Sequence, residues 1–382
     1  CEILMIIKRK RMKDNIKAAF WTITIFSFLF QCYFRSLSQF IVPALIVFLL
    51  LEISNVKLKH PRGWLMVFSG YCVFLAFSAV VSFYKGTDIS NIIRFALILI
   101  LIPLAVQVND PRFEREWRIF KVLSCVKAIS MFFIWGAVFF SQDYQKYRAW
   151  AFQIGSGDIY ILNKIPRVQL LGTSLFVLAA IIEIEKKKKV TSYGICMILA
   201  AFVAGNSAYI LGMVVYGIVK FIQISIKWLL RRNWKIIPLM GLALLVLVVF
   251  ANYTVIVLEQ KKEQSNVVRK EQVEVLMDAN LLSGEGLGHR IIKETSTRNY
   301  NGDTYFELQT LYIVNQIGVV GLGLFYILTS IPYCGKTKKQ CLIAYFVYLV
   351  YSFWNPYCFD STHIITVLMI TNILEQKKKW LR

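Results

Sequence analysis

Charged side chains are scarce in this sequence. Asp, Glu, Lys and Arg make up 17% of the 382 residues, whereas hydrophobic residues make up 57%. An ordinary soluble domain carries about a quarter of charged residues and fewer apolar ones. The shortage of charge therefore excludes a soluble globular protein of usual composition. Runs of about 18 or more apolar residues recur instead, and each is long enough to cross the apolar core of a bilayer as a helix.

Residues that hold metal ions or form disulfide frameworks are also few. The sequence has 3 His, and its 8 Cys lie mostly within or beside apolar segments, without the paired spacing of a metal site. We interpret these cysteines as small apolar side chains. The polar loops contain no carboxylate pair of the DxD type. We therefore expect neither a metal site nor a cofactor.

Acidic residues are half as numerous as basic ones, 22 against 44, and the formal net charge is +22. Such a surplus can indicate a nucleic-acid partner, but here Lys and Arg stand at the ends of apolar segments. Membrane topology explains this pattern better, because Lys and Arg concentrate in cytoplasmic loops. We therefore expect no nucleic-acid partner, and we expect both termini in the cytoplasm.

The apolar segments predict an all-α integral membrane protein with about 12 transmembrane helices and one large external loop that carries an amphipathic helix. Three parts are expected along the chain. Residues 1–258 hold helices 1–9 and a smaller external loop at 141–169, residues 259–308 form the large external loop, and residues 309–382 hold helices 10–12. Within the first part, the ninth helix is expected at 236–258.

The large loop is unusually basic for an external segment. Seven Lys and Arg residues lie between Lys261 and Arg298, on the side where the positive-inside rule disfavours them. An anionic ligand explains this concentration. The first half of the loop also shows helical periodicity, which predicts an amphipathic helix on the outer membrane surface. Its inner face consists of Val268, Gln272, Val275, Leu276 and Ala279.

The predicted helix leads into the sequence LLSGEGLG. Here Gly284, Gly286 and Gly288 permit tight turns and the close approach of a ligand. No strand precedes this turn and no βαβ unit surrounds it, which excludes a dinucleotide site. The segment DTYFELQTLY follows, and the next apolar helix opens with NQIGVVGLG.

In this order of parts the chain resembles the Wzy-type polysaccharide polymerases of the O-antigen ligase/polymerase superfamily. The matching positions are Arg269, Gly284, Gly286, Gly288, Asp303, Tyr305, Glu307, Gln309, Gly318 and Gly321, with a weaker match at Pro166, Arg167, Gly172, Gly205, Asn206 and Ser207. Ligases of the superfamily carry a His where this chain has Tyr300–Asp303, and the frequent Ser-Arg pair is replaced by Asn206-Ser207. Both departures favour a polymerase.

The resemblance implies a glycosyltransferase that polymerises polyprenyl-pyrophosphate-linked oligosaccharide repeat units into a surface polysaccharide, such as O-antigen, capsule or exopolysaccharide. It implies a multi-pass protein of the bacterial cytoplasmic membrane, in contact with membrane lipid, that works with a flippase and a chain-length regulator. Two alternatives stay open. One is ligase-type transfer of glycan to another acceptor, and the other is transport of polysaccharide or lipid-linked sugar.

The expected chemistry needs cations for the leaving pyrophosphate and a group that takes the proton of the acceptor hydroxyl. Candidates for the proton acceptor are Asp303, Glu307, His289 and Glu285. Candidates for substrate binding are Arg269, Arg167, Arg290, Arg298 and Arg94, together with Gly284, Gly286 and Gly288. Structural roles are open for several of them: Arg269 can pair with Glu263 or Glu271, and Asp303 and Glu307 can favour a helix start.

Overall fold

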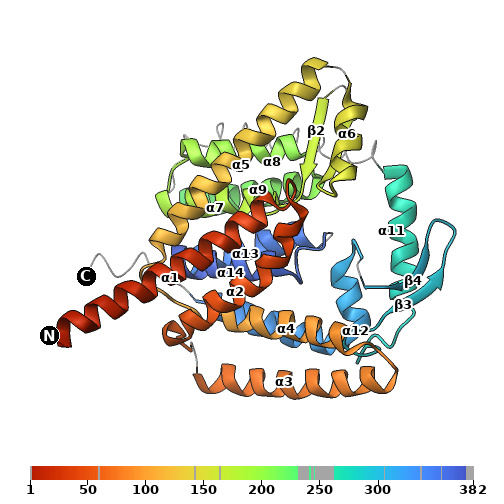
Figure 1. Cartoon of the computed structure of the whole chain (residues 1–382), viewed down its shortest axis with the longest axis horizontal. Helices are drawn as coiled ribbons and strands as arrows, with labels where there is room; N and C mark the ends of the chain where they lie inside the picture. The colour runs from red at the N-terminus through yellow and green to blue at the C-terminus, as the bar shows by residue number, and fades with distance from the viewer. Residues whose placement is uncertain are drawn as a thin grey trace. The chain divides into compact units, whose positions relative to one another are not determined.

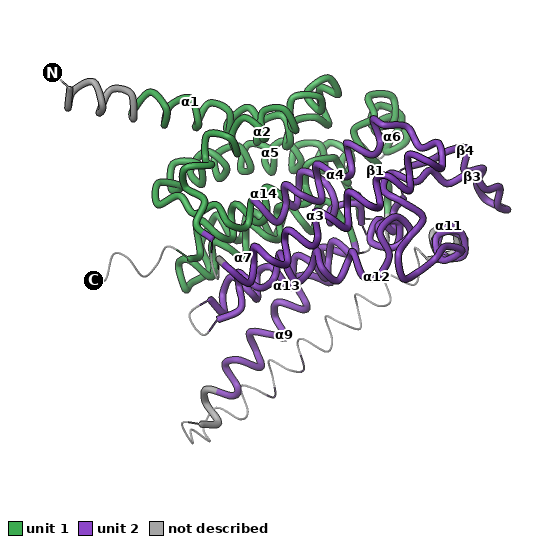
Figure 2. The backbone as a smooth tube through the Cα atoms, turned by 90° about the horizontal axis from the view of Figure 1, so that it is seen from below, with its two compact units in different colours: residues 1–57, 105–206, 364–382 green, residues 58–104, 207–363 purple. Residues whose placement is uncertain are grey.

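The computed structural model describes residues 2–58, 61–141, 143–162, 165–230, 241, 245, 262–304, 306–335, 338–353 and 355–375. The chain divides into two compact units, each built from separate stretches of sequence (Figure 2). Unit 1 comprises Cys1–Lys57, Ala105–Asn206 and Ile364–Arg382, and unit 2 comprises Leu58–Leu104 and Ser207–His363.

Unit 1 contains a helical hairpin, a long helix, a small sheet and two short apolar helices (Figure 1). Its elements are α1 (Glu2–Phe30), α2 (Ser38–Glu52), α5 (Glu114–Ser141), α6 (Tyr144–Gln153), β1 (Gly157–Leu162), β2 (Ile165–Leu170), α7 (Phe176–Lys187), α8 (Ser192–Ala204) and the π-helical turn Ile370–Leu374. Short 3-10 turns at Arg35–Leu37 and Ile53–Asn55 flank α2. The strands β1 and β2 pair antiparallel, which sets Tyr160 opposite Arg167.

Unit 2 contains the long apolar helices around the polar insert. Its elements are α3 (Pro61–Tyr84), α4 (Ile89–Val106, whose last two residues belong to unit 1), α9 (Ser207–Leu230), α11 (Lys262–Leu276), β3 (Ile291–Glu294), β4 (Asn299–Asp303), α12 (Gln309–Ser330), the 3-10 turn Ile331–Tyr333, α13 (Lys339–Ser352) and the start of α14 (Ser361–Met369). Strands β3 and β4 form an antiparallel hairpin with an irregularity between Ile291 and Ile292.

Six helices of the described chain are long and apolar enough to cross a membrane. They span Arg35–Asn55, Arg62–Tyr84, Ile89–Val106, Glu114–Ser141, Ser207–Ile226 and Gln309–Tyr333. A mostly helical chain with helices suited to a membrane is therefore confirmed, whereas the total of about 12 crossings stays a prediction. The ninth expected helix, at 236–258, lies outside the described residues except for Gly241 and Leu245.

Four other expected crossings coincide with shorter helices. α7, α8 and α13 have 12, 13 and 14 residues, and α14 has 9 with a further 5 in the π-helical turn. At about 1.5 Å of rise per residue they reach roughly 18–21 Å, less than the ~30 Å core of a bilayer. Every α7 residue from Phe176 to Glu183 is buried, so this helix packs within unit 1 and has no apolar face left for lipid.

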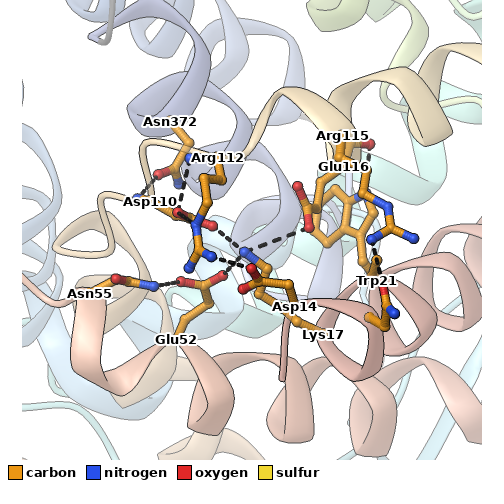
Figure 3. Close-up of polar contacts among 12 residues, drawn as sticks. Asp14, Lys17, Trp21, Glu52, Asn55, Asp110, Arg112, Arg115, Glu116 and Asn372 are labelled. Carbon is orange, nitrogen blue, oxygen red and sulfur yellow. Dashed lines mark hydrogen bonds and ion pairs between the residues drawn. The ribbon is translucent and has the colours of Figure 1, made fainter. Parts of the chain in front are cut away.

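A buried ion cluster joins the elements of unit 1 (Figure 3). Lys17 Nζ lies 2.8 Å from Glu52 Oε1 and 3.6 Å from Glu116 Oε1, and it also donates to Asp110 Oδ2. All four side chains are at most 4% exposed. The backbone N–H of Asp110 donates to Asn372 Oδ1 at 2.6 Å. One ammonium group therefore links α1, α2 and the entry to α5, and Asp110 extends the cluster to the π-helical turn Ile370–Leu374.

Candidate active site

The polar insert of unit 2 folds as α11, a glycine-rich turn and the β3–β4 hairpin, and it ends where α12 begins (Figure 1). The expected amphipathic helix is present as α11. Its Gln272, Val275 and Leu276 are buried, whereas Lys270 and Glu274 are exposed. The apolar face of this helix thus packs on the rest of unit 2.

The helix α12 is interrupted at Gly318, whose backbone (φ 65, ψ 178) is not helical. A break leaves carbonyl and N–H groups without partners in their own helix. The glycine-rich turn supplies those partners. The N–H groups of Glu285 and Gly286 donate to the carbonyls of Asn315 (2.7 Å) and Gln316 (3.0 Å).

Bonds in the opposite direction complete the contact between the turn and the break. The N–H groups of Val319 and Val320 donate to the carbonyls of Leu281 (2.8 Å) and Leu282 (3.4 Å). The turn therefore replaces about one turn of helix hydrogen bonds, which explains why a polar, glycine-rich segment stands beside an apolar helix.

The three glycines of the turn allow this close packing. Gly284, Gly286 and Gly288 have φ values of 78, 117 and 78, a region that side chains with a Cβ avoid. A Cβ on Gly284 would overlap the Gln316 carbonyl, and one on Gly286 would lie 3.0 Å from Ser82. The close approach is thus to α12 and α3. Contact of these glycines with a ligand stays a prediction.

Cations and carboxylates from distant segments meet beside this turn. Lys85, which follows α3, donates to Glu285 Oε2 at 2.5 Å. Arg290 Nη1 donates to Asp88 Oδ2 at 2.6 Å, and its Nε donates to the Gly302 carbonyl at 3.1 Å. Both basic side chains are almost half exposed, at 45% and 46%, so they lie at the surface of unit 2 where a solute can reach them.

Charged residues from several segments lie near Tyr312, in the first turn of α12. Its hydroxyl donates to the His289 carbonyl at 2.6 Å. Its ring packs against Phe95, the neighbour of Arg94 on α4, with ring centres 5.6 Å apart. Arg290 follows His289 directly and donates to the carbonyl of Gly302, which precedes Asp303. The structure therefore brings together four residues selected from the sequence: Arg94 on α4, His289 and Arg290 between the glycine-rich turn and β3, and Asp303 at the end of β4.

Arg269 and Glu307, one a binding and the other a catalytic candidate, pair with each other. Arg269 Nε lies 3.3 Å from Glu307 Oε2. Glu271, an alternative partner for Arg269, instead accepts hydrogen bonds from Thr295 (2.7 Å) and from the hydroxyls of Ser296 and Thr297. The Glu263 side chain lies outside the described part of the chain.

The hairpin loop, residues 295–298 between β3 and β4, makes the Glu271 carboxyl more acidic. Hydrogen bonds from Ser296, Thr297 and Thr295 lower the pKa of Glu271 to about 2. This carboxylate is therefore ionised at every physiological pH and ties α11 to the hairpin. Arg298, in the same loop, is exposed, and its backbone N–H donates to Thr295 Oγ1 at 3.1 Å.

His289 and Glu285 are close enough to influence each other. Burial lowers the pKa of His289 and the Lys85 charge lowers it further, against the opposite effect of Glu285. The hydrogen bonds from Lys85 and from the Asn280 N–H lower the pKa of Glu285. At neutral pH this part of the site holds a neutral imidazole and an ionised, ion-paired carboxylate.

Arg167 lies on β2 in unit 1. It is only 8% exposed, and its Nη1 donates to the Phe202 carbonyl at 2.9 Å. Among the described residues no carboxylate pairs with it, and its Nε has no hydrogen-bond partner. A buried guanidinium without a counter-charge favours an anion, which agrees with its selection from the sequence.

The structure adds one acidic residue that the sequence analysis missed. Asp360 stands at the end of the loop between α13 and α14, and it is half-buried. Burial raises the pKa of Asp360 to about 7, against hydrogen bonds from Thr362 and His363 and the charge of Arg94. The sequence does contain a feature that could have identified Asp360: it is an acidic residue directly before an apolar helix, on the side of the membrane expected to be external.

This arrangement can bind an anion and accept a proton. Arg94, Arg290 and Lys85 are basic, and the carboxylates of Asp88 and Glu285 lie among them. Comparison with protein-family models, curated proteins and solved structures gives no match for this chain. The resemblance to the polymerases therefore depends on the sequence motifs alone. Tyr305, one of the motif positions, lies outside the described residues.

Proposed function

We propose that this chain is a polysaccharide polymerase that joins polyprenyl-pyrophosphate-linked repeat units at the outer face of a bacterial cell membrane. The observation that supports this best is the group of charged residues beside Tyr312: Arg290 and Asp303 lie next to its bonded partner His289, and Arg94 lies next to Phe95, which packs on its ring. Arg is permanently charged and can bind phosphate oxygens in pairs. Cations beside a carboxylate suit a reaction that releases pyrophosphate and takes up a proton.

In the proposed reaction, a sugar hydroxyl of one lipid-linked repeat attacks the anomeric carbon of the growing chain. The bond from that carbon to the pyrophosphate oxygen breaks, and the polyprenyl pyrophosphate leaves with the electron pair. Positive charge stabilises this developing anion. The donor already carries an activated leaving group, so neither a nucleotide sugar nor a further activating group is needed.

The proposed topology has about 12 helices, both termini in the cytoplasm and the segment 259–308 outside. Six apolar helices and the polar character of the insert support it. An external site also suits the proposed partners, because a flippase delivers lipid-linked repeats to that face and a chain-length regulator acts on the product.

A transporter of lipid-linked sugar is the second candidate, and the interruption of α12 favours it. Broken membrane helices often form the substrate site of transporters, where the freed backbone groups bind solute. Here four such groups, at Asn315, Gln316, Val319 and Val320, bond to the glycine-rich turn. They are satisfied within unit 2, which favours the polymerase over the transporter.

The test uses purified protein in detergent and lipid-linked repeats extracted from cells that lack it. We expect longer lipid-linked chains without nucleotide sugar or added metal, separated by gel electrophoresis. Arg290→Gln should slow chain growth by at least about tenfold, because it removes one of the charges that stabilise the leaving group. Arg148→Gln is the matched control, since Arg148 is equally exposed and also ion-paired, with Asp158 of unit 1.

Two other outcomes would point elsewhere. Transfer of preformed glycan to a different acceptor, without chain growth, would indicate a ligase-type reaction. No extension by the wild-type protein, together with movement of intact repeats across a vesicle membrane, would show that the chain is a transporter.

A further inference from the structure

Asp360 lies on a loop that is fixed against the start of α12. In this loop, the Phe359 N–H donates to Gln309 Oε1 at 3.3 Å, and the Phe353 carbonyl accepts from Thr310 Oγ1 at 3.4 Å. Gln309 and Thr310 open the same helix turn that carries Tyr312. The loop therefore holds Asp360 at the end of α12 where the candidate site of unit 2 lies.

Arg94 lies beside the same turn of α12. Its neighbour Phe95 packs on the Tyr312 ring with ring centres 5.6 Å apart, and the Arg94 charge opposes the rise in the pKa of Asp360. Its guanidinium lies 5.7 Å from the centre of the Phe95 ring, and among the described residues it forms no ion pair. The Arg94 residue is exposed and Asp360 is half-buried, so Arg94 is accessible to a ligand beside the loop that carries Asp360.

We propose that Asp360 is the catalytic base, which takes the proton from the acceptor hydroxyl while Arg94 faces the leaving pyrophosphate. This inference rests on the polymerase function proposed above. The hydroxyl O–H bond breaks and its proton passes to a carboxylate oxygen of Asp360. The hydroxyl oxygen bonds to the anomeric carbon, and the bond from that carbon to the pyrophosphate breaks. No other reactant is consumed.

Two of the other acidic candidates are less suited to the role. Glu307 is bound by Arg269 and Glu285 by Lys85, and a positive partner stabilises the ionised form and weakens it as a base. Asp360 has no such partner among the described residues. Burial raises its pKa to about 7, which is close to the operating pH and suits both acceptance and release of a proton.

Several charged or titratable groups surround Asp360. Arg94 on α4, His363 on α14, and Cys358 and Tyr348 from the loop and α13 all interact with it. Of these, the charge of Arg94 and the backbone N–H of His363 favour the ionised carboxylate. The ionised form is the active base, so the rate of chain growth should fall about tenfold per pH unit below pH 7 and level off above it.

Asp360 also has a structural role, and substitutions can separate this role from the proposed catalytic one. Its Oδ1 accepts from the Thr362 N–H at 2.8 Å, which caps the start of α14. Asn and Ser cap helices about as well as Asp does, but neither can serve as a carboxylate base. Asp360→Asn and Asp360→Ser therefore keep the cap and remove the chemistry.

The experiment measures initial rates of chain growth from extracted lipid-linked repeats between pH 5 and 9, for wild-type protein and for both variants. We expect both variants to lose at least about a hundredfold and to lose the rise in rate toward pH 7. Asp360→Glu should restore part of the rate with a shifted midpoint. The Tm in detergent should stay near that of the wild type for all three.

The contrary outcomes of this experiment can be told apart, and each overturns a different claim. Wild-type protein that extends chains, with Asp360→Asn showing the same rate and pH profile, would overturn the role of Asp360 and leave the polymerase function standing. A fall in Tm that accompanies the loss of rate in Asp360→Asn, without restoration by Asp360→Glu, would assign Asp360 to the helix cap alone. Wild-type protein that extends nothing would overturn both proposals.

Discussion

Arg269 and Glu307 are 38 positions apart in the sequence, yet Arg269 Nε lies 3.3 Å from Glu307 Oε2. The pair connects α11 to the segment that enters α12. Both side chains are partly exposed, at 37% and 44%, and exposed pairs contribute only about 0–1 kcal/mol. A phosphate group can therefore compete with Glu307 for the guanidinium at little cost in stability.

Arg269→Lys tests that competition. Lysine keeps the positive charge but loses the two-pronged contact with phosphate oxygens, so we expect chain growth to fall at least about tenfold at a normal protein level. Glu307→Gln is the control, because it removes the same ion pair and leaves the guanidinium intact. Equal losses in both variants would show that only the ion pair matters, and wild-type polymer from Arg269→Lys would assign Arg269 to a structural role.

Topology can be tested by labelling in intact cells. In a variant without native cysteines, a Cys introduced between Ser296 and Gly302 should react with an impermeant thiol reagent. A Cys at position 187 should not, because it lies in a Lys-rich run expected in the cytoplasm. The opposite pattern of labelling would exclude an external site and with it the proposed function.

Gly284→Ala should destabilise the protein. The residue has φ 78, and an added Cβ would overlap the backbone of Gln316. We expect a loss of about 1–3 kcal/mol and a lower Tm in detergent. Gly70→Ala is the matched control, because Gly70 lies in α3 with nothing within 4 Å of the added atom. An unchanged Tm for Gly284→Ala would contradict the packing of the turn on α12.

Lys17→Met should destabilise unit 1 strongly. The substitution leaves Glu52, Asp110 and Glu116 buried without their shared cation (Figure 3), and loss of one partner from a buried ion pair costs about 3–5 kcal/mol. Lys13→Met, one helical turn earlier on α1 and exposed, should have little effect. Thermal unfolding in detergent measures both, and similar Tm values would mean that the cluster is not structural.

Local composition was sufficient to predict the helical membrane class, the amphipathic helix α11 and the basic polar insert. The reason is that apolar run length and helical periodicity act over neighbouring residues. Arg269, Arg290, Asp303 and His289 could be selected for the same reason, because polar residues in such a chain are concentrated in one segment. Their roles as ligands of a substrate remain predictions.

Only the tertiary structure could show which of these residues meet. Arg269 pairs with Glu307 and not with Glu271, because the hairpin loop occupies Glu271. The glycines pack on a broken helix whose break at Gly318 no local pattern predicts. Asp360 joins the site through its loop's contacts with α12. These relations depend on segments far apart in the sequence, and packing and hydrogen bonding between them are decided only when the chain has folded.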